Sequence, residues 1–207
     1  VGPHTISVPR LKRADDIDPD QFDNGISDEI FTKIIACIRM AVPYTGMIIS
    51  TRESEKVRKR ALEVGISQIS GASRTSVGGY TEEERPHDTE QFDVSDQRSL
   101  DEVVCWLMEK GHIPSFCTAC YRAGRTGEEF MKVAKTKFVH NFCIPNAILT
   151  FKEYLVDYAS PATKELGEKT IAEHLAQFEG SAMHKKLTDM LTRIENGSWE
   201  KEDIEEL

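Results

Sequence analysis

The chain has 207 residues, of which 39% are hydrophobic and 29% are charged, so it is an ordinary globular chain with room for one large domain or two small ones. Its formal net charge of −9 argues against a nucleic-acid partner, because phosphate-binding surfaces are basic. The longest apolar runs are too short to span a bilayer, which argues against a membrane protein.

The first third of the chain alternates predicted strands and helices. Short β-branched or apolar segments predict strands at 5–8, 46–51 and 66–70. Between them, Ser27 caps a predicted helix that Pro43 ends, and residues 54–64 form a second predicted helix that Gly65 closes. This order of elements predicts a parallel sheet with an α/β fold. The first helix carries one apolar stripe, made of Ile30, Phe31, Ile34, Ile35 and Ile38.

The rest of the chain has no strand pattern. Residues 71–97 are rich in glycine, serine and charge, and predict a loop or linker. Helical stripes follow, and Thr126 with Glu129 predicts a capping box at the start of one helix. Pro145 is expected in the first turn of a helix that runs to about Tyr158. A last stripe is expected from Met183, Leu187, Met190, Leu191 and Ile194.

Three of the five cysteines lie in one region, which favours metal binding in a reducing compartment over a disulfide framework. Cys117, Cys120 and Cys143 follow the spacing Cys-x2-Cys-x22-Cys, and His140 lies three residues before the last of them. From this spacing alone a zinc site with His140, an iron–sulfur cluster and a redox pair all stay open. Three thiolates leave one iron of a cluster open to an outside ligand.

Two arginines beside the cysteine pair favour the iron–sulfur alternative. Arg122 and Arg125 would offset the negative charge of a thiolate-bound cluster, although either residue can also be an ordinary surface arginine. The other two cysteines, Cys37 and Cys105, lie in predicted helices and are expected to be packing residues.

Several segments resemble one enzyme family along the whole chain. They are "GPHTISVPRL", "ISTRE", "GASRTSVGGY" and "CTACYRAGRTG" followed by Cys143. They are similar to the C-terminal half of the FeFe-hydrogenase maturation tyrosine lyases, which are radical S-adenosylmethionine enzymes. The cysteine motif separates these enzymes from the tyrosine lyases of thiamine synthesis, which lack it.

The resemblance implies a fold and a domain order. The family has a (β/α)8 barrel, or TIM barrel, and residues 1–80 would supply about strands six to eight. Residues 81–97 would be a linker, and residues 98–207 a helical domain that binds an auxiliary 4Fe-4S cluster. The chain opens with Val-Gly-Pro rather than Met and lacks the family's Cys-x3-Cys-x2-Cys motif. We therefore expect a piece of a longer protein that is inactive alone.

The resemblance also implies an activity. Enzymes of this family are carbon–carbon lyases that use S-adenosylmethionine and a second 4Fe-4S cluster to split tyrosine into p-cresol and dehydroglycine. They convert the latter to carbon monoxide and cyanide on an additional iron attached to the auxiliary cluster, for assembly of the hydrogenase H-cluster. The implied partners are tyrosine, free cysteine as an iron ligand and other hydrogenase maturation proteins, in the cytoplasm, with no nucleic acid and no membrane.

Individual residues take roles through the resemblance. Cys117, Cys120 and Cys143 match the ligands of the auxiliary cluster, and His4 is the candidate ligand of the extra iron. A structural histidine in the barrel floor is the alternative for His4. Arg52, at the end of a predicted strand, matches the arginine that binds the substrate carboxylate.

Further positions at strand ends are candidates for the lining of the substrate or S-adenosylmethionine pocket. They are Ser50, Ser70 and Arg10, and each has a structural role as its alternative. The rival function for the whole chain is a zinc-stabilised binding module without catalysis, in which three cysteines and His140 hold the metal.

Overall fold

The computed structural model describes residues 3–14, 17–76, 78–80, 91–124, 126–136 and 139–198. It has two compact units, which we call the sheet unit (Gly2–Ser99) and the helical unit (Leu100–Leu207). No helix in these described ranges is both long enough and apolar enough to cross a membrane.

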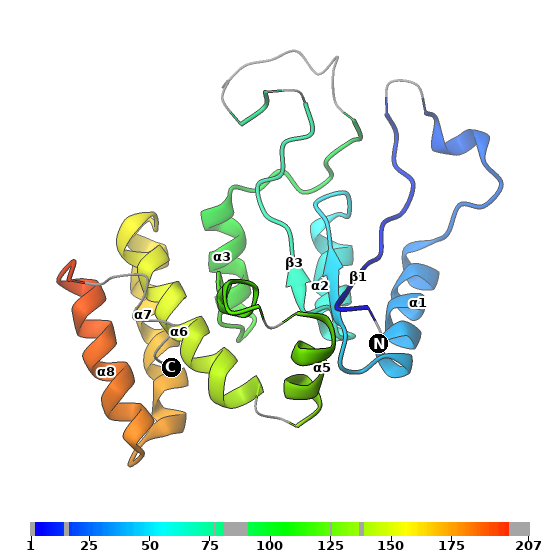
Figure 1. Ribbon diagram of the computed structural model, residues 1–207. Helices are drawn as coiled ribbons and strands as arrows, with labels where there is room; N and C mark the ends of the chain where they lie inside the picture. The colour runs from blue at the N-terminus through cyan, green and yellow to red at the C-terminus, as the bar shows by residue number, and fades with distance from the viewer. Residues whose placement is uncertain are drawn as a thin grey trace. The chain divides into compact units, whose positions relative to one another are not determined.

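The sheet unit contains one parallel sheet of three strands in the order β1-β2-β3 (Figure 1). The strands are β1 (Thr5–Ser7), β2 (Gly46–Ile49) and β3 (Gln68–Ile69). Ile6 lies opposite Met47, and Ile48 lies opposite Gln68. The three predicted parallel strands are therefore confirmed. Each is shorter than predicted, and β2 ends at Ile49 because the chain turns there, with the N–H of Glu53 donating to the carbonyl of Ser50 at 3.3 Å.

Two helices of the sheet unit pack against β2. They are α1 (Asp28–Ala41) and α2 (Glu55–Glu63), and the hydroxyls of Ser27 and Ser54 cap them, as the sequence predicts for Ser27. A short 3-10 helix, η1 (Pro19–Gln21), precedes α1. The shared core consists of Phe31, Ile35, Met47, Ile49, Val57, Ala61 and Ile66. Met47 and Ile49 alternate along β2, so one face of the strand supplies both side chains.

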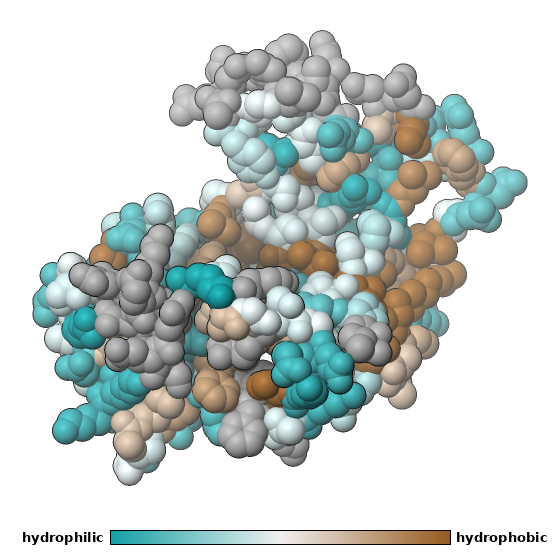
Figure 2. Space-filling view, viewed as in Figure 1, coloured by the Kyte–Doolittle hydropathy of each residue, from teal (hydrophilic) through white to brown (hydrophobic). Residues whose placement is uncertain are grey.

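The apolar stripe of α1 is only partly buried. Phe31 and Ile35 are 1% and 0% exposed, whereas Ile30 and Ile34 are 49% and 38% exposed. Hydrophobic side chains consequently gather on the visible surface of α1, on the right of Figure 2. The predicted stripe is present on α1, and Phe31 and Ile35 are the members of it that belong to the core shared with the sheet.

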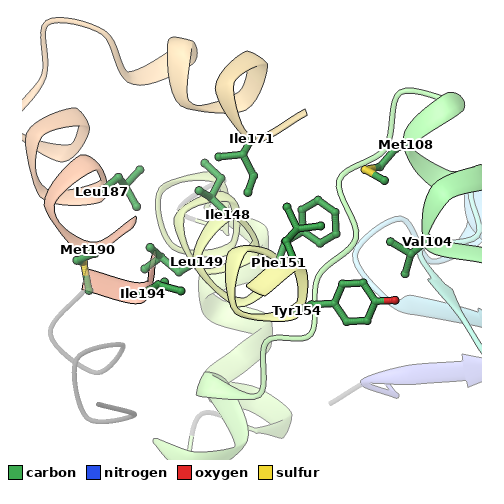
Figure 3. Packing of buried hydrophobic residues seen from close by; sticks show 11 residues of the cluster. Val104, Met108, Ile148, Leu149, Phe151, Tyr154, Ile171, Leu187, Met190 and Ile194 are labelled. Atoms are coloured by element: carbon green, nitrogen blue, oxygen red, sulfur yellow. The ribbon is translucent and has the colours of Figure 1, made fainter. Parts of the chain in front are cut away.

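The helical unit is built around α6. Its elements are α3 (Leu100–Glu109), α4 (Ala119–Arg122), α5 (Gly127–Lys135), α6 (Val139–Asp157), α7 (Pro161–Leu175), the 3-10 helix η3 (Ala176–Phe178) and α8 (Ala182–Glu195). Side chains of α3, α6, α7 and α8 converge in one core (Figure 3). From the predicted last stripe, Leu187, Met190 and Ile194 of α8 are buried there.

Two helix starts differ from the sequence prediction. Helix α6 begins at Val139, so Pro145 lies inside it rather than in its first turn. Proline has no N–H, so Pro145 cannot donate to the carbonyl of Asn141, but packing of the following apolar residues continues the helix. Thr126 precedes α5, yet its hydroxyl makes no capping hydrogen bond, and Glu129 pairs with Lys132 at 2.6 Å instead. The predicted capping box is therefore wrong.

A carboxylate ties three helices of the helical unit together. Asp101 of α3 accepts hydrogen bonds from the hydroxyls of Ser160 (2.7 Å) and Thr163 (2.9 Å) at the start of α7, and from Tyr154 of α6 (3.2 Å). Burial would raise the pKa of Asp101, but these hydrogen bonds outweigh it and hold the pKa below its ordinary value. Burial and the nearby Asp101 charge raise the pKa of Tyr154 to about 12.

Candidate functional site

The three cysteines of the motif all lie in the helical unit. Cys117 and Cys120 are half-buried, the first just before α4 and the second within it. Cys143 is exposed and lies in α6, two residues before Pro145. None of the five cysteines forms a disulfide. Because α6 starts early, Cys143 is held by a helix, whereas the sequence had placed it ahead of one.

The loop that carries Cys117 is attached to α6. The backbone N–H of Phe116 donates to the hydroxyl of Thr150 at 3.3 Å, and that hydroxyl donates to the carbonyl of Asn146 at 2.9 Å. The ring of Phe116 stacks on Tyr154 with centroids 4.9 Å apart. Cys117 is therefore anchored on the same helix that carries Cys143.

The three thiols are not grouped around a common metal position in this structure. Among the residues that it describes, no three His, Cys, Asp or Glu side chains are grouped so that they could hold a metal ion. The donor set nevertheless fits an iron–sulfur cluster, because three thiols lie in one unit and the N–H of Ala119 points at the Sγ of Cys117 at 3.5 Å. Arg122 is exposed on α4. Arg125 and the side chain of His140 lie outside the described residues.

The residues proposed to line a pocket follow the strands of the sheet unit at their carboxyl ends. Arg10 lies three residues after β1, Ser50 and Arg52 follow β2, and Ser70 follows β3. Because the strands are parallel, these positions share one edge of the sheet. His4 precedes β1 and so lies at the opposite, amino end, where its carbonyl accepts a hydrogen bond from Gly46 at 3.0 Å.

Arg10 is committed to other protein groups. Its guanidinium donates to Glu53 with two nitrogens, the Nε at 3.0 Å, and pairs with Asp28 at 2.9 Å. The same group lies 4.5 Å from the ring centroid of Phe31. The hydrogen bond to Glu53 raises the pKa of Arg10 above its ordinary value, although burial acts against this shift. With both carboxylates bound, Arg10 links the loop after β1 to the loop after β2 and to the start of α1.

A buried ion pair that the sequence reasoning missed supports the end of β3. Arg58 of α2 is 0% exposed and pairs with Asp96, and it also donates to the carbonyl of Ser70. Arg98 donates to the same carboxylate at 2.9 and 2.6 Å. Burial would raise the pKa of Asp96, but the hydrogen bonds from Arg98 and the charge of Arg58 hold it low. The available signal was the position of Arg58 three residues before Ala61, which puts the two residues on one face of α2.

Arg52 differs from these arginines. Its guanidinium carbon lies 3.6 Å from the ring centroid of Phe92, and its backbone N–H donates to the hydroxyl of Ser50 at 3.3 Å. Within the part of the chain that the structure describes, no carboxylate or carbonyl oxygen pairs with its guanidinium. A half-buried guanidinium with unused donors at the carboxyl end of a parallel strand can bind an anionic group such as a carboxylate.

Residues 91–96 bind the loops that follow all three strands. The N–H of Asp93 donates to the carbonyl of Arg13 at 2.9 Å, and the N–H groups of Ser95 and Asp96 donate to that of Thr51 at 3.0 Å. The hydroxyl of Thr75 donates to the carbonyl of Phe92 at 3.0 Å. We call residues 91–96 the edge segment, because its contacts run along the edge that carries Arg52.

A family model described as the Biotin and Thiamin Synthesis associated domain matches residues 7–113. Among curated proteins, the 2-iminoacetate synthase of Escherichia coli strain K12 is 31% identical over 113 residues. The 2-iminoacetate synthase of Salmonella typhimurium is 27% identical over 112 residues. Each match covers 54% of this chain and 28% of the relative, so the chain spans less than a third of these proteins.

Two solved structures are similar over nearly the whole chain. A crystal structure of HydG, a maturase of the FeFe-hydrogenase, has a TM-score of 0.90 and 54% identity, and covers 97% of this chain and 43% of its own. The FeFe-hydrogenase maturase HydG from Carboxydothermus hydrogenoformans has a TM-score of 0.68 and 38% identity, and covers 92% of this chain and 40% of its own.

These similarities and the parallel sheet confirm the predicted α/β fold class, and they fit the C-terminal region of a radical S-adenosylmethionine fold. They also confirm the resemblance to the C-terminal half of the hydrogenase maturation lyases. With a match that spans more than half of its residues, the chain belongs to the Biotin and Thiamin Synthesis associated domain family.

Proposed function

We propose that this chain is the C-terminal part of a radical S-adenosylmethionine lyase that cleaves tyrosine during maturation of FeFe-hydrogenase. One observation carries the proposal. The family domain ends at residue 113, before Cys117, whereas the similarity to HydG covers 97% of the chain. The similarity to HydG therefore extends beyond the family domain. It includes most of the helical unit, which carries the three cysteines.

The helical unit has the role of holding an auxiliary cluster. Residues 98–207 form this domain and residues 1–80 are part of the barrel, and residues 81–97 lead from one to the other, with the edge segment bound to the sheet unit. Cys117, Cys120 and Cys143 are the three protein ligands of a 4Fe-4S cluster, and the attachment of Phe116 to Thr150 keeps the cysteine loop on α6. When bound, this group would carry the additional iron that collects carbon monoxide and cyanide, with His4 and free cysteine as further ligands of that iron.

The sheet unit has the role of binding the substrate. Arg52 binds the carboxylate of tyrosine with its unused donors, and Ser50 and Ser70 lie beside it at strand ends. Arg10 contributes indirectly, because it binds Glu53, the residue that follows Arg52 in the chain. The complete enzyme supplies the second cluster and the S-adenosylmethionine that start tyrosine cleavage to p-cresol and dehydroglycine. Other hydrogenase maturation proteins receive the product.

The test separates the two chemistries in the complete enzyme that contains this chain. Replacing Cys117 and Cys120 together by serine should leave p-cresol release largely intact and abolish the infrared bands of metal-bound carbon monoxide and cyanide. The matched control is Cys37→Ser, which removes an exposed thiol of α1 outside the motif and should keep both products. Persistence of the infrared bands in the double variant would show that these thiols do not hold the cluster.

The same protein also decides between iron and zinc. A brown, anaerobically purified protein whose iron falls in the double variant supports the proposal. One zinc per chain that is lost in the double variant, with the iron content unchanged, would favour a zinc-stabilised module with three cysteines and His140.

A further inference from the structure

We infer that Phe92 is a positioning residue for carboxylate binding, because its ring fixes the plane in which the Arg52 guanidinium presents its donors. This inference rests on the proposed role of Arg52 in binding the substrate carboxylate. It adds a residue that lies 40 positions further along the chain, in the edge segment.

The stacking of Phe92 on Arg52 leaves the N–H donors of the guanidinium accessible. The guanidinium carbon lies 3.6 Å from the centroid of the Phe92 ring, so the ring covers one face of the planar group. The N–H donors of a guanidinium point outward in its own plane, in a fork that matches the two oxygens of a carboxylate. Stacking therefore orders the fork without using any of its donors.

Phe92 is itself held on both sides by the backbone. The hydroxyl of Thr75 donates to its carbonyl at 3.0 Å, and the N–H of the preceding Gln91 donates to the carbonyl of Thr75 at 3.3 Å. The following Asp93 donates to the carbonyl of Arg13 at 2.9 Å. The ring thus belongs to a fixed part of the edge and can restrain a long side chain.

Two carboxylates near Arg52 in the chain or in the edge segment, Glu53 and Asp96, are bound by other cations. Glu53 follows Arg52 in the chain, but Arg10 binds it at 3.0 Å and Lys12 lies 3.6 Å from it. Asp96 lies in the edge segment itself, but Arg58 and Arg98 bind it. Glu53 and Asp96 therefore each have cations of their own, and within the described ranges no oxygen pairs with the guanidinium beside Phe92, which leaves it available for an incoming anion.

The test is a double-mutant cycle in the complete enzyme with tyrosine as the substrate. Phe92→Leu keeps an apolar side chain but removes the ring, and it should raise KM about tenfold, in line with the loss of a partly buried cation–π contact. Phe92→Trp keeps a ring and should restore most of the affinity. In an Arg52→Gln background, Phe92→Leu should raise KM by less than about twofold, because the guanidinium that it positions is gone.

The outcomes separate this inference from the proposal on which it rests. If Arg52→Gln leaves KM unchanged, Arg52 does not bind the carboxylate, and both the proposed role of Arg52 and the positioning role of Phe92 are wrong. If Arg52→Gln raises KM but Phe92→Leu does not, the anchor stands and the positioning role is overturned. An equal rise from Phe92→Leu in both backgrounds would assign Phe92 to general packing. Cleavage of S-adenosylmethionine in the absence of tyrosine shows whether each variant is folded.

Discussion

The backbone N–H of Phe116 donates to the hydroxyl of Thr150 at 3.3 Å, and this bond fixes the loop that leads into Cys117 on α6. We expect Thr150→Val to leave that N–H without its partner, which costs about 1 kcal/mol and loosens the loop. In the metal-free enzyme, Cys117 should then react faster with an alkylating reagent, and reconstitution should load less iron per chain. Thr150→Ser keeps the hydroxyl and is the matched control. Equal labelling rates in both variants would show that the bond does not restrain the loop.

Gly167 sets the distance between α7 and α6. A Cβ at this position would come within 2.5 Å of the Cδ2 of Leu155, which is 1% exposed and has little room to move. We expect Gly167→Ala to lower the free energy of unfolding by about 1–2 kcal/mol, because overpacking outweighs the better helix propensity of alanine. Urea denaturation measures the change. In a Leu155→Ala background the added methyl group should instead stabilise the protein, and a loss there as well would contradict the packing argument.

Arg58 and Arg60 lie two residues apart on α2 but in different environments. Arg58 is buried with Asp96 and the carbonyl of Ser70, whereas Arg60 is exposed. We expect Arg58→Met to lower the free energy of unfolding by about 3 kcal/mol, because it removes one partner of a buried pair. Arg60→Met should change it by less than about 0.5 kcal/mol. Similar denaturation midpoints for the two variants would mean that the buried pair does not support the sheet unit.

The carboxylate of Asp101 should make stability depend on pH. Hydrogen bonds from Ser160, Thr163 and Tyr154 hold its pKa in the folded protein below the ordinary value of 3.8. The unfolded chain therefore takes up the proton first, and the stabilisation that is complete above pH 3.8 is lost as the pH falls through the lower folded pKa. Denaturation midpoints from pH 6 downward should fall less steeply for Asp101→Asn than for the unchanged protein. Parallel curves for the two proteins would rule out this linkage.

The order of elements could be predicted from the sequence, because strand and helix patterns are local. The caps at Ser27 and Ser54 lie within three residues of the N–H groups that they bind, so residues close in the chain decide them. The start of α6 could not be predicted in this way. The proline rule places Pro145 at a helix start, but buried neighbours in α6 contact three other helices, and this packing outweighs one missing hydrogen bond.

The sequence by itself determined the α/β class, the cysteine motif and the position of Arg52 at the end of a strand. Only the tertiary structure decided which arginine is available to bind a ligand. Arg10 pairs with Glu53 across 43 residues and Arg58 pairs with Asp96 across 38, whereas the Arg52 guanidinium stacks on the ring of Phe92 and pairs with no carboxylate among the described residues. The physical reason is that ion pairing depends on which charges the folded chain brings within a few ångströms. Neither the composition nor the periodicity of the sequence predicts the distances between those charged groups.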